Sequence, residues 1–441
     1  MEHSIFHMLA TTTSGLAEPT RAAPAAARPA AAPARASGAA TADKALCIAL
    51  VTPMLPVPHD QTRGRYIHET ARSLAKVADV RVFFQQLRYP DLPGMKPRSY
   101  LHGGVGADYS APGIDVEAFE YPGIPVLSRV LNGYVCSRAL APRVRAFNPD
   151  VVLAYWVYPD GYAALRVARA LGVPCVVGAL GSDIHVRSGM NQLMTRRTIA
   201  GADALLTVSE AMRRTAIDTF GAAPDRVHTV VNGFNTTVFG PADQTDARQS
   251  LGLGADDRIV VYVGRIVEAK GMRELVGAAQ QLCRDDPRLR VVVIGDGVMK
   301  AELEALIQSS GMAGCIRLTG GLEPHQVAQW ICAADLLTLP SWSEGYPNVV
   351  VEALACGRPV VATDVGGTRE IVNPENGLLI PRKDVVALQA ALRQALDRRW
   401  DHAAIAAAMQ RSWDDVAKET LAVCEALVPA SRRQARQPVF A

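Results

Sequence analysis

Two glutamates, Glu344 and Glu352, are the residues of this sequence best suited to chemistry. Glu352 stands among valine, alanine and leucine residues, a pattern typical of a buried helix. An unpaired carboxylate costs several kcal/mol to bury or stays protonated, so Glu352 needs a partner. The two hydroxyls of a vicinal diol, such as that of a ribose, can both donate to one carboxylate. The alternative partner is a cation inside the protein.

Glu344 lies in the polar loop before this helix, which we expect to start near Pro347. A proline fits the first helical turn because its missing N–H would be unpaired there anyway. The other amides at a helix start face outward and attract anions. In this loop they belong to Gly345, Tyr346, Asn348 and Val349. A sugar and a phosphate could share this loop, unless Glu344 is an ordinary solvated residue.

A second loop carries two cations, Arg265 and Lys270, between Gly264 and Gly271. The glycines allow tight turns directly after an apolar strand pattern. Arginine can bind two phosphate oxygens at once, and lysine adds a mobile point charge. Solvated surface cations are the usual alternative for such a pair. Because the loop follows a strand and faces the same cleft as Glu344, we expect a diphosphate site.

Strand and helix patterns alternate along most of the chain. The expected strands are residues 45–51, 80–84, 151–154, 175–178, 204–208 and 227–231 in a first series, and 258–263, 291–294, 316–318, 336–339 and 359–362 in a second. Such alternation predicts parallel sheets covered by helices on both faces. The predicted fold class is α/β, with two Rossmann-like domains facing across a cleft. Ligands in such folds lie at the carboxyl ends of the strands, where both loops stand.

Composition and turn signals predict the domain boundaries. Alanine and proline dominate residues 1–43, which we expect to be a disordered tail, with a transit peptide as the minority alternative. Residues 44–238 then form the N-terminal domain, and residues 239–413 form the C-terminal domain. Residues 414–428 form a helix that crosses back to the first domain, and residues 429–441 a flexible tail.

The overall composition excludes several classes of protein. The 441 residues carry a formal charge of only +3, so we expect no nucleic-acid partner. No apolar run approaches the roughly 18 residues of a membrane helix, and no secretory leader is evident. The eight cysteines are scattered without a Cys-x-x-Cys pair, which fits a reducing compartment better than a disulfide framework or a zinc site.

Further motifs accompany the two loops. They are Val208-Ser209-Glu210-Ala211-Met212, Asn232-Gly233, Gly295-Asp296-Gly297, Cys356-Gly357-Arg358-Pro359-Val360-Val361-Ala362, Gly366-Gly367, Glu370 and Asn376-Gly377. With the two glutamates and the two cations, this set resembles the family 4 glycosyltransferases, which are retaining enzymes of the GT-B fold. The resemblance covers residues 44–427, and the loops are similar to those of bacterial members that assemble exopolysaccharides and other cell-surface glycans.

The resemblance implies a role for each residue of the two loops. Arg265 and Lys270 would bind the diphosphate of a nucleotide sugar. Glu352 would bind the ribose hydroxyls, and Glu344 a hydroxyl of the transferred sugar. The segment Gly345, Tyr346, Pro347, Asn348 and Val349 would contact phosphate or sugar. Gly64 would let the backbone of the first domain approach the phosphate. No cofactor is implied beyond the substrate itself, a sugar of the UDP or GDP type.

The first domain departs from the family pattern at Leu180. Many relatives carry a histidine at this position, whereas a leucine cannot donate a hydrogen bond to a sugar. Asp183 and His185 follow in the same loop and are the remaining catalytic candidates there. The alternatives are that Asp183 caps the next segment and that His185 is a surface residue.

The implied reaction moves a hexose to an acceptor hydroxyl with retention at the anomeric carbon. The sequence contains no Asp-x-Asp pair, so we expect the reaction to be independent of metal. The expected acceptor, held by the N-terminal domain, is a glycan or a lipid-linked oligosaccharide of surface polysaccharide biosynthesis. Two alternatives are a nucleotide-sugar epimerase of the same fold and a non-catalytic protein that binds nucleotide sugars.

A helical pattern at residues 126–147 bears on where in the cell the protein acts. It sets Arg129, Arg138, Arg143 and Arg145 among apolar residues. Such a surface could rest on an anionic membrane, although a solvated helix face is the commoner explanation. We therefore expect a cytoplasmic enzyme with peripheral contact to the inner face of the membrane.

Overall fold

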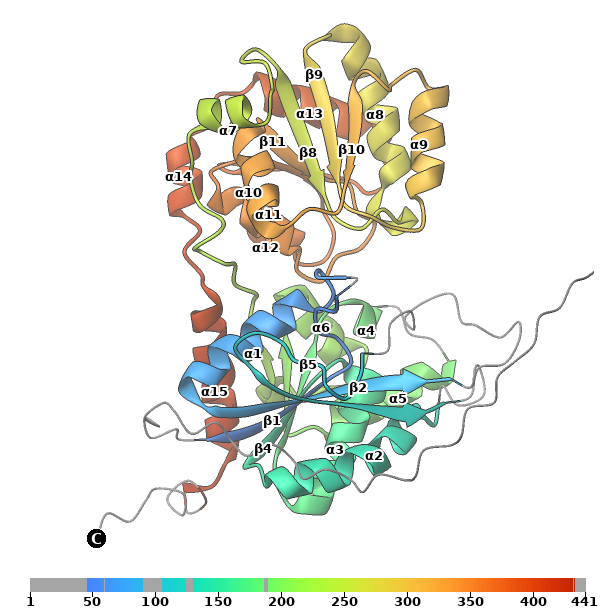
Figure 1. Cartoon of the computed structure of the whole chain (residues 1–441), viewed down its shortest axis with the longest axis vertical. Helices are drawn as coiled ribbons and strands as arrows, with labels where there is room; N and C mark the ends of the chain where they lie inside the picture. Colours follow the sequence, from blue (N-terminus) through green and yellow to red (C-terminus); the bar gives the residue numbers. More distant parts are fainter. Residues whose placement is uncertain are drawn as a thin grey trace, which may run out of the picture. The chain divides into compact units, whose positions relative to one another are not determined.

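The computed structural model describes residues 46–58, 60–89, 105–123, 130–185, 189–430 and 432, without the side chains of Ser182 and His185. The expected N-terminal tail and nearly all of the expected C-terminal tail lie outside these ranges. Within them, two parallel sheets of seven and six strands confirm the predicted α/β class with two Rossmann-like domains (Figure 1).

The N-terminal sheet has the strand order β3-β2-β1-β4-β5-β6-β7, and all its pairings are parallel. Its strands are β1 (Cys47–Thr52), β2 (Asp79–Arg88), β3 (Asp115–Pro122), β4 (Val151–Tyr155), β5 (Cys175–Ala179), β6 (Ala204–Thr207) and β7 (Val227–Thr229). The sequence pattern did not predict β3. This edge strand has charged and half-buried positions, so it lacks the continuous apolar run of a central strand.

Helices cover this sheet on both faces, because alternate residues of its strands enter two separate hydrophobic clusters. The elements are α1 (Arg65–Val77), α2 (Asn132–Phe147), η1 (Val157–Gly161), α3 (Tyr162–Leu171), α4 (Ser182–His185), α5 (Gly189–Gly201), α6 (Glu210–Asp218) and η2 (Pro224–Arg226). On β1, Ile48 and Leu50 enter one cluster, while Ala49 and Val51 enter the other. The sheet is therefore the centre of a three-layer domain.

The C-terminal sheet has the order β10-β9-β8-β11-β12-β13 and is also fully parallel. Its strands are β8 (Arg258–Val263), β9 (Leu289–Ile294), β10 (Ile316–Gly320), β11 (Leu336–Leu339), β12 (Val360–Thr363) and β13 (Gly377–Ile380). The other elements are α7 (Gln244–Ser250), η3 (Glu268–Lys270), α8 (Met272–Asp285), α9 (Lys300–Ser309), α10 (Pro324–Ala333), α11 (Asn348–Ala355), α12 (Thr368–Ile371), α13 (Val385–Asp397) and α14 (His402–Ala407). The observed order places β8 and β11, the strands before the two chemistry-bearing loops, side by side.

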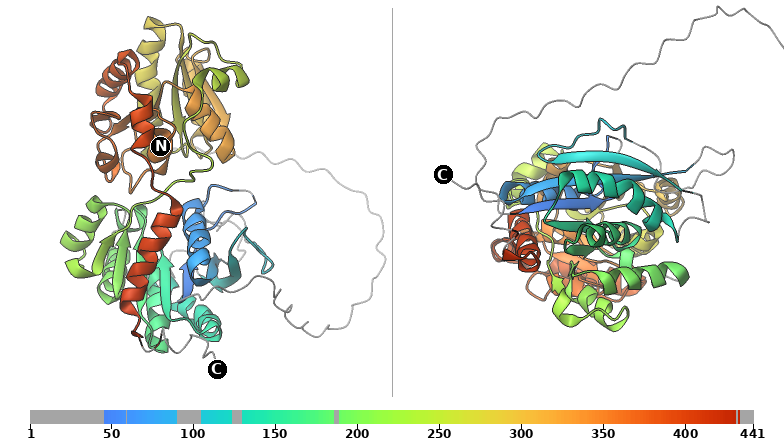
Figure 2. Two further views of the ribbon diagram at one scale, coloured as in Figure 1. Left: turned by 90° about the vertical axis from the view of Figure 1, so that its left-hand side faces the viewer. Right: turned by 90° about the horizontal axis from the view of Figure 1, so that it is seen from below.

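The last helix, α15 (Trp413–Leu427), packs against α1 of the first domain (Figure 2). Its residues Trp413, Val416 and Cys424 belong to a hydrophobic cluster of the N-terminal sheet. The chain thus passes between the domains twice, and the two passages touch: the amide of Phe234 donates to the carbonyl of Arg411 at 3.2 Å.

One disulfide, Cys283–Cys315, joins the end of α8 to the segment before β10. The expectation of scattered single thiols was wrong for this pair, because the two Cα atoms lie only 6.3 Å apart in the fold. Six further cysteines are free and buried. Among the described residues, no helix combines the length and the apolarity needed to cross a bilayer.

Candidate active site

Glu344 and Lys270 form a salt bridge at the carboxyl ends of β11 and β8. The distance from Lys270 Nζ to Glu344 Oε1 is 2.5 Å, and both side chains are largely buried. Their loops are held together by the amide of Trp342, which donates to the carbonyl of Ala269 at 2.8 Å. The sequence predicted a common cleft for these two residues, and the structure adds that they neutralise each other there.

Gly271 makes this close approach of the loops possible. Its φ of 71° lies in the left-handed region. A Cβ at this position would lie 2.1 Å from the carbonyl oxygen of Pro340. A side chain would therefore drive the lysine loop away from the glutamate loop, so the glycine sets the geometry of the salt bridge.

Arg265 is exposed and stands at the turn after β8. The described part of the structure records no ion pair for its guanidinium. Its carbonyl accepts a hydrogen bond from the hydroxyl of Tyr262 at 2.9 Å, which fixes the backbone of the turn. The next turn packs against it so closely that a Cβ at Gly295 would lie 1.9 Å from the carbonyl oxygen of Gly264. A rigid turn thus presents a free guanidinium, which suits an incoming phosphate.

Glu352 lies on α11, one of whose faces is buried against the C-terminal core. Burial raises the pKa of its carboxyl group to about 7, and the positive charge of Arg65 opposes the rise. Among the described residues, no salt bridge to Glu352 is present, so the structure does not support an internal cation as its partner. The carboxylate is available for a ligand, as the diol interpretation requires.

The helix α11 begins one residue later than the sequence suggested. Pro347 has an extended conformation (φ −79°, ψ 99°) and occupies the capping position, so the expectation that it lies in the first helical turn was wrong. Proline fixes φ but leaves ψ free, and an extended ψ suits the residue before the helix equally well. No described side chain caps α11, which leaves its first amides for another acceptor.

Gly64 precedes α1 with a left-handed φ of 60°. A Cβ there would lie 2.4 Å from the carbonyl oxygen of Met54, so only glycine permits this loop to fold onto itself. Arg65, the next residue, is the charge felt by Glu352. It lines a cavity of about 670 Å³, which also includes Leu322 and Glu323 after β10. Sequence reasoning missed Arg65, because no motif marks it apart from its neighbour Gly64.

Asp183 is completely buried and accepts hydrogen bonds from the backbone. Its oxygens lie 2.8 Å from the amide of Gly181, 3.0 Å from that of Leu180 and 3.3 Å from that of Val157. Burial raises the pKa of Asp183 and these amides oppose the rise. Its oxygens therefore hold the Leu180–Gly181 turn that precedes it, and its expected role toward the reacting sugar or the acceptor stays a prediction. The side chain of His185 lies outside the described residues, so its role stays a prediction.

Family models match both halves of the chain. Residues 64–238 match the model described as Glycosyltransferase Family 4, and residues 243–413 match the model of glycosyl transferases group 1. A D-inositol 3-phosphate glycosyltransferase of Acidothermus cellulolyticus is 30% identical over 418 residues, which cover 88% of this chain and 92% of that protein. The chain belongs to the family 4 glycosyltransferases.

Other relatives of this glycosyltransferase are similar over part or all of its length. The putative teichuronic acid biosynthesis glycosyltransferase TuaC of Bacillus subtilis is 35% identical over 253 residues, covering 56% of this chain and 61% of that protein. Among solved structures, sucrose-phosphate synthase from Thermosynechococcus elongatus covers 88% of this chain and 96% of its own, with a TM-score of 0.65 at 21% identity. Anabaena HepE in complex with UDP-glucose covers 88% and 98%, with a TM-score of 0.61 at 18% identity. These structures support the GT-B fold.

Proposed function

We propose that this family 4 glycosyltransferase moves a hexose from a nucleoside diphosphate sugar to a glycan or lipid-linked oligosaccharide acceptor, with retention at the anomeric carbon. The observation that carries the proposal is the charge arrangement at one sheet edge. It combines a free guanidinium at Arg265, a paired ammonium at Lys270 and a carboxyl group at Glu352 with a raised pKa. A diphosphate matches the two cations, the two hydroxyls of a ribose match Glu352, and a hydroxyl of the transferred sugar matches Glu344, the partner of Lys270.

Departure of the diphosphate builds negative charge on its oxygens. We expect Arg265, Lys270 and the first amides of α11 to stabilise that charge, the electrostatic kind of catalysis that usually contributes most. The acceptor hydroxyl forms the new bond to the anomeric carbon from the face that the diphosphate leaves. Its proton passes to the departing phosphate oxygen, so no protein nucleophile is required.

We propose UDP as the first nucleotide to test and GDP as the second. Support for UDP comes from the structural relative HepE, whose structures contain UDP, glucose or UDP-glucose. The cavity lined by Arg65 and Glu323 gives room for the base, and the charge of the same Arg65 acts on the ribose partner Glu352.

The acceptor is proposed as a surface glycan because the relative TuaC is named for teichuronic acid biosynthesis. We propose that the start of α2 contacts the cytoplasmic face of the membrane. Two apolar side chains are exposed there, Leu131 by 57% and Tyr134 by 39%. Of the arginines expected to serve it, Arg143 is partly neutralised by Glu117 at 3.2 Å, and Arg129 lies outside the described residues. Membrane contact therefore rests on Arg138, Arg145 and the exposed apolar groups.

The test is incubation with UDP-, GDP- and ADP-hexoses and a lipid-linked acceptor, with product analysis, alongside thermal stabilisation by the three nucleotides. A nucleotide at about a hundred times its Kd should stabilise the protein by roughly 2.7 kcal/mol, and Glu352→Ala should lose that gain. Isomerised donor without transfer would identify an epimerase instead. Tight nucleotide binding with no turnover of any donor would identify a binding protein.

A further inference from the structure

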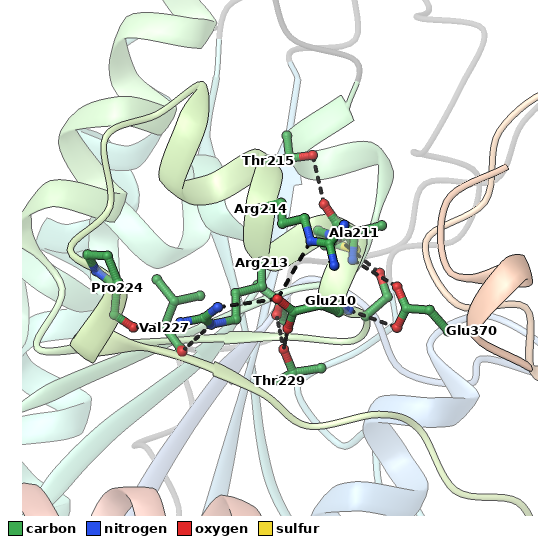
Figure 3. A network of polar contacts seen from close by, with 12 residues as sticks. Glu210, Ala211, Arg213, Arg214, Thr215, Pro224, Val227, Thr229 and Glu370 are labelled. Atoms are coloured by element: carbon green, nitrogen blue, oxygen red, sulfur yellow. Dashed lines mark hydrogen bonds and ion pairs between the residues drawn. The ribbon is translucent and has the colours of Figure 1, made fainter.

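The carboxylate of Glu370, in the C-terminal domain, caps a helix of the N-terminal domain (Figure 3). Glu370 belongs to the short helix α12, and its two oxygens accept hydrogen bonds from the amides of Glu210 and Ala211 at 2.9 and 2.8 Å. These are the first two amides of α6. The third, that of Met212, donates to the hydroxyl of Ser209 at 3.2 Å. A helix start that would otherwise lack partners is thus completed by a residue from the other domain.

The same short helix is tied to the donor loop. The amide of Gly367 donates to the carbonyl of Gly345 at 3.0 Å, and the amide of Glu370 donates to the carbonyl of Gly367 at 3.1 Å. A Cβ at Gly366 would lie 1.8 Å from the carbonyl oxygen of Glu344. The turn before α12 is therefore packed directly against the backbone of Glu344 and hydrogen-bonded to that of Gly345.

The donor loop itself touches the N-terminal domain beside this contact. A Cβ at Gly345 would lie 2.6 Å from the carbonyl oxygen of Leu180. The ring of Tyr346 packs against hydrophobic clusters of both domains. The amide group of Asn232 donates to Asn348 at 2.8 Å. The segment that follows Glu344 therefore contacts the N-terminal domain at three points, beside the polar contact made by Glu370.

We propose that Glu370 is a positioning residue for glycosyl transfer, which couples the approach of the two domains to the placement of Glu344 at the reacting sugar. The inference rests on the proposed function. Glu370 acts through the Gly367–Gly345 hydrogen bond and touches neither donor nor acceptor. Its charge also suits its place, because a carboxylate at a helix start is stabilised by the helix dipole.

The charges around the contact explain why a carboxylate is tolerated there. Glu210, whose amide binds Glu370, directs its own side chain to Arg213 at 3.2 Å and Arg214 at 3.8 Å, and also accepts from the hydroxyl of Thr229. The two acidic side chains therefore do not compete for the same donors. Since Glu370 is exposed, the contact is screened by water and can form and break during a catalytic cycle.

Steady-state kinetics and nucleotide binding of Glu370→Ala, Glu370→Gln and the control Glu375→Ala test the proposal. Glu375 is equally exposed, shortly after α12. We expect Glu370→Ala to lower kcat about five- to tenfold, the scale of a lost helix cap. The Kd of the nucleoside diphosphate should stay within about twofold, because the side chains expected to bind its phosphates and ribose, Arg265, Lys270 and Glu352, lie in the C-terminal domain. Glu370→Gln, which keeps an acceptor oxygen, should recover part of the rate, and Glu375→Ala should match the wild type.

Small-angle scattering with and without the nucleotide gives a second measurement. The nucleotide-bound Glu370→Ala protein should have a larger radius of gyration than the nucleotide-bound wild type. A wild-type kcat in Glu370→Ala would overturn the proposal. An effect confined to a higher nucleotide Kd, with kcat unchanged, is such a result. If the wild type turned over no nucleotide sugar, the proposed function would fall, whereas equal radii for the two proteins would separately overturn the role of Glu370.

Discussion

Replacement of Glu352 by glutamine should stabilise the protein without ligand, and more so as the pH rises. The folded protein holds the proton of Glu352 more tightly than the unfolded chain, because burial raises its pKa from 4.5 to about 7. Ionising the group within the fold therefore costs stability. The cost is nearly absent below pH 4.5, grows as the pH rises toward 7, and is constant above.

The expected size follows from this pKa shift. It corresponds to about 3 kcal/mol at pH 8 and about 1 kcal/mol at pH 5, since one pKa unit is about 1.4 kcal/mol. Glutamine has similar shape and no charge to bury. For a domain of this size, Glu352→Gln should raise the melting temperature by roughly 6–12 °C at pH 8 and by only a few degrees at pH 5.

Thermal unfolding of wild type and Glu352→Gln between pH 5 and pH 8 measures this difference. Glu344→Gln is the matched control, because it breaks the salt bridge with Lys270 and should destabilise the protein across the range. Saturating UDP should reverse the order at pH 8, since ribose hydroxyls would satisfy the wild-type carboxylate only. If the difference in melting temperature between wild type and Glu352→Gln did not vary with pH, the reasoning would be refuted.

Three further predictions concern the diphosphate site. Lys270→Ala should lower kcat roughly a hundredfold and change the nucleotide Kd less than about fivefold, because Lys270 already has an anionic partner; calorimetry showing a parallel loss of affinity would contradict this. Arg265→Ala should raise the Kd about tenfold, because its free guanidinium gains a phosphate on binding, and an unchanged Kd would remove Arg265 from the site. EDTA should leave the transfer rate unchanged, and a loss restored by Mg²⁺ or Mn²⁺ would show that metal independence is wrong.

The sequence was sufficient to predict the two parallel sheets, because the buried strands of such sheets are continuous apolar runs. Most of the strands that it predicted lie within one or two residues of those observed. The edge strands β3 and β13 were missed: Asp115, Glu117 and Glu120 interrupt the apolar pattern of β3, and β13 is only four residues long. The apolar pattern of the sequence therefore identified the central strands and failed at one edge of each sheet, where the strands are only partly buried.

Within the site, sequence spacing predicted which loops meet but not how their charges are arranged. It placed Lys270 and Glu344 on one sheet edge, whereas their mutual salt bridge depends on the close approach at Gly271. Asp183 was a candidate for the sugar because an aspartate in a loop can contact a ligand or backbone amides, and the three amides that donate to it come together only in the fold. Contacts between residues that are far apart in the sequence leave no local sequence pattern from which they could be predicted.

The salt bridge between Lys270 and Glu344 bears on when Lys270 contributes during the reaction. A lysine that is already neutralised exchanges one anion for another when the donor binds, so its net gain in the ground state is small. As the bond to the sugar lengthens, the diphosphate becomes the more negative of the two anions. The attraction of Lys270 for it then grows, while the attraction for Glu344 is constant. Because of the salt bridge, Lys270 stabilises the transition state more than it stabilises the bound donor. Only such a difference in binding accelerates a reaction.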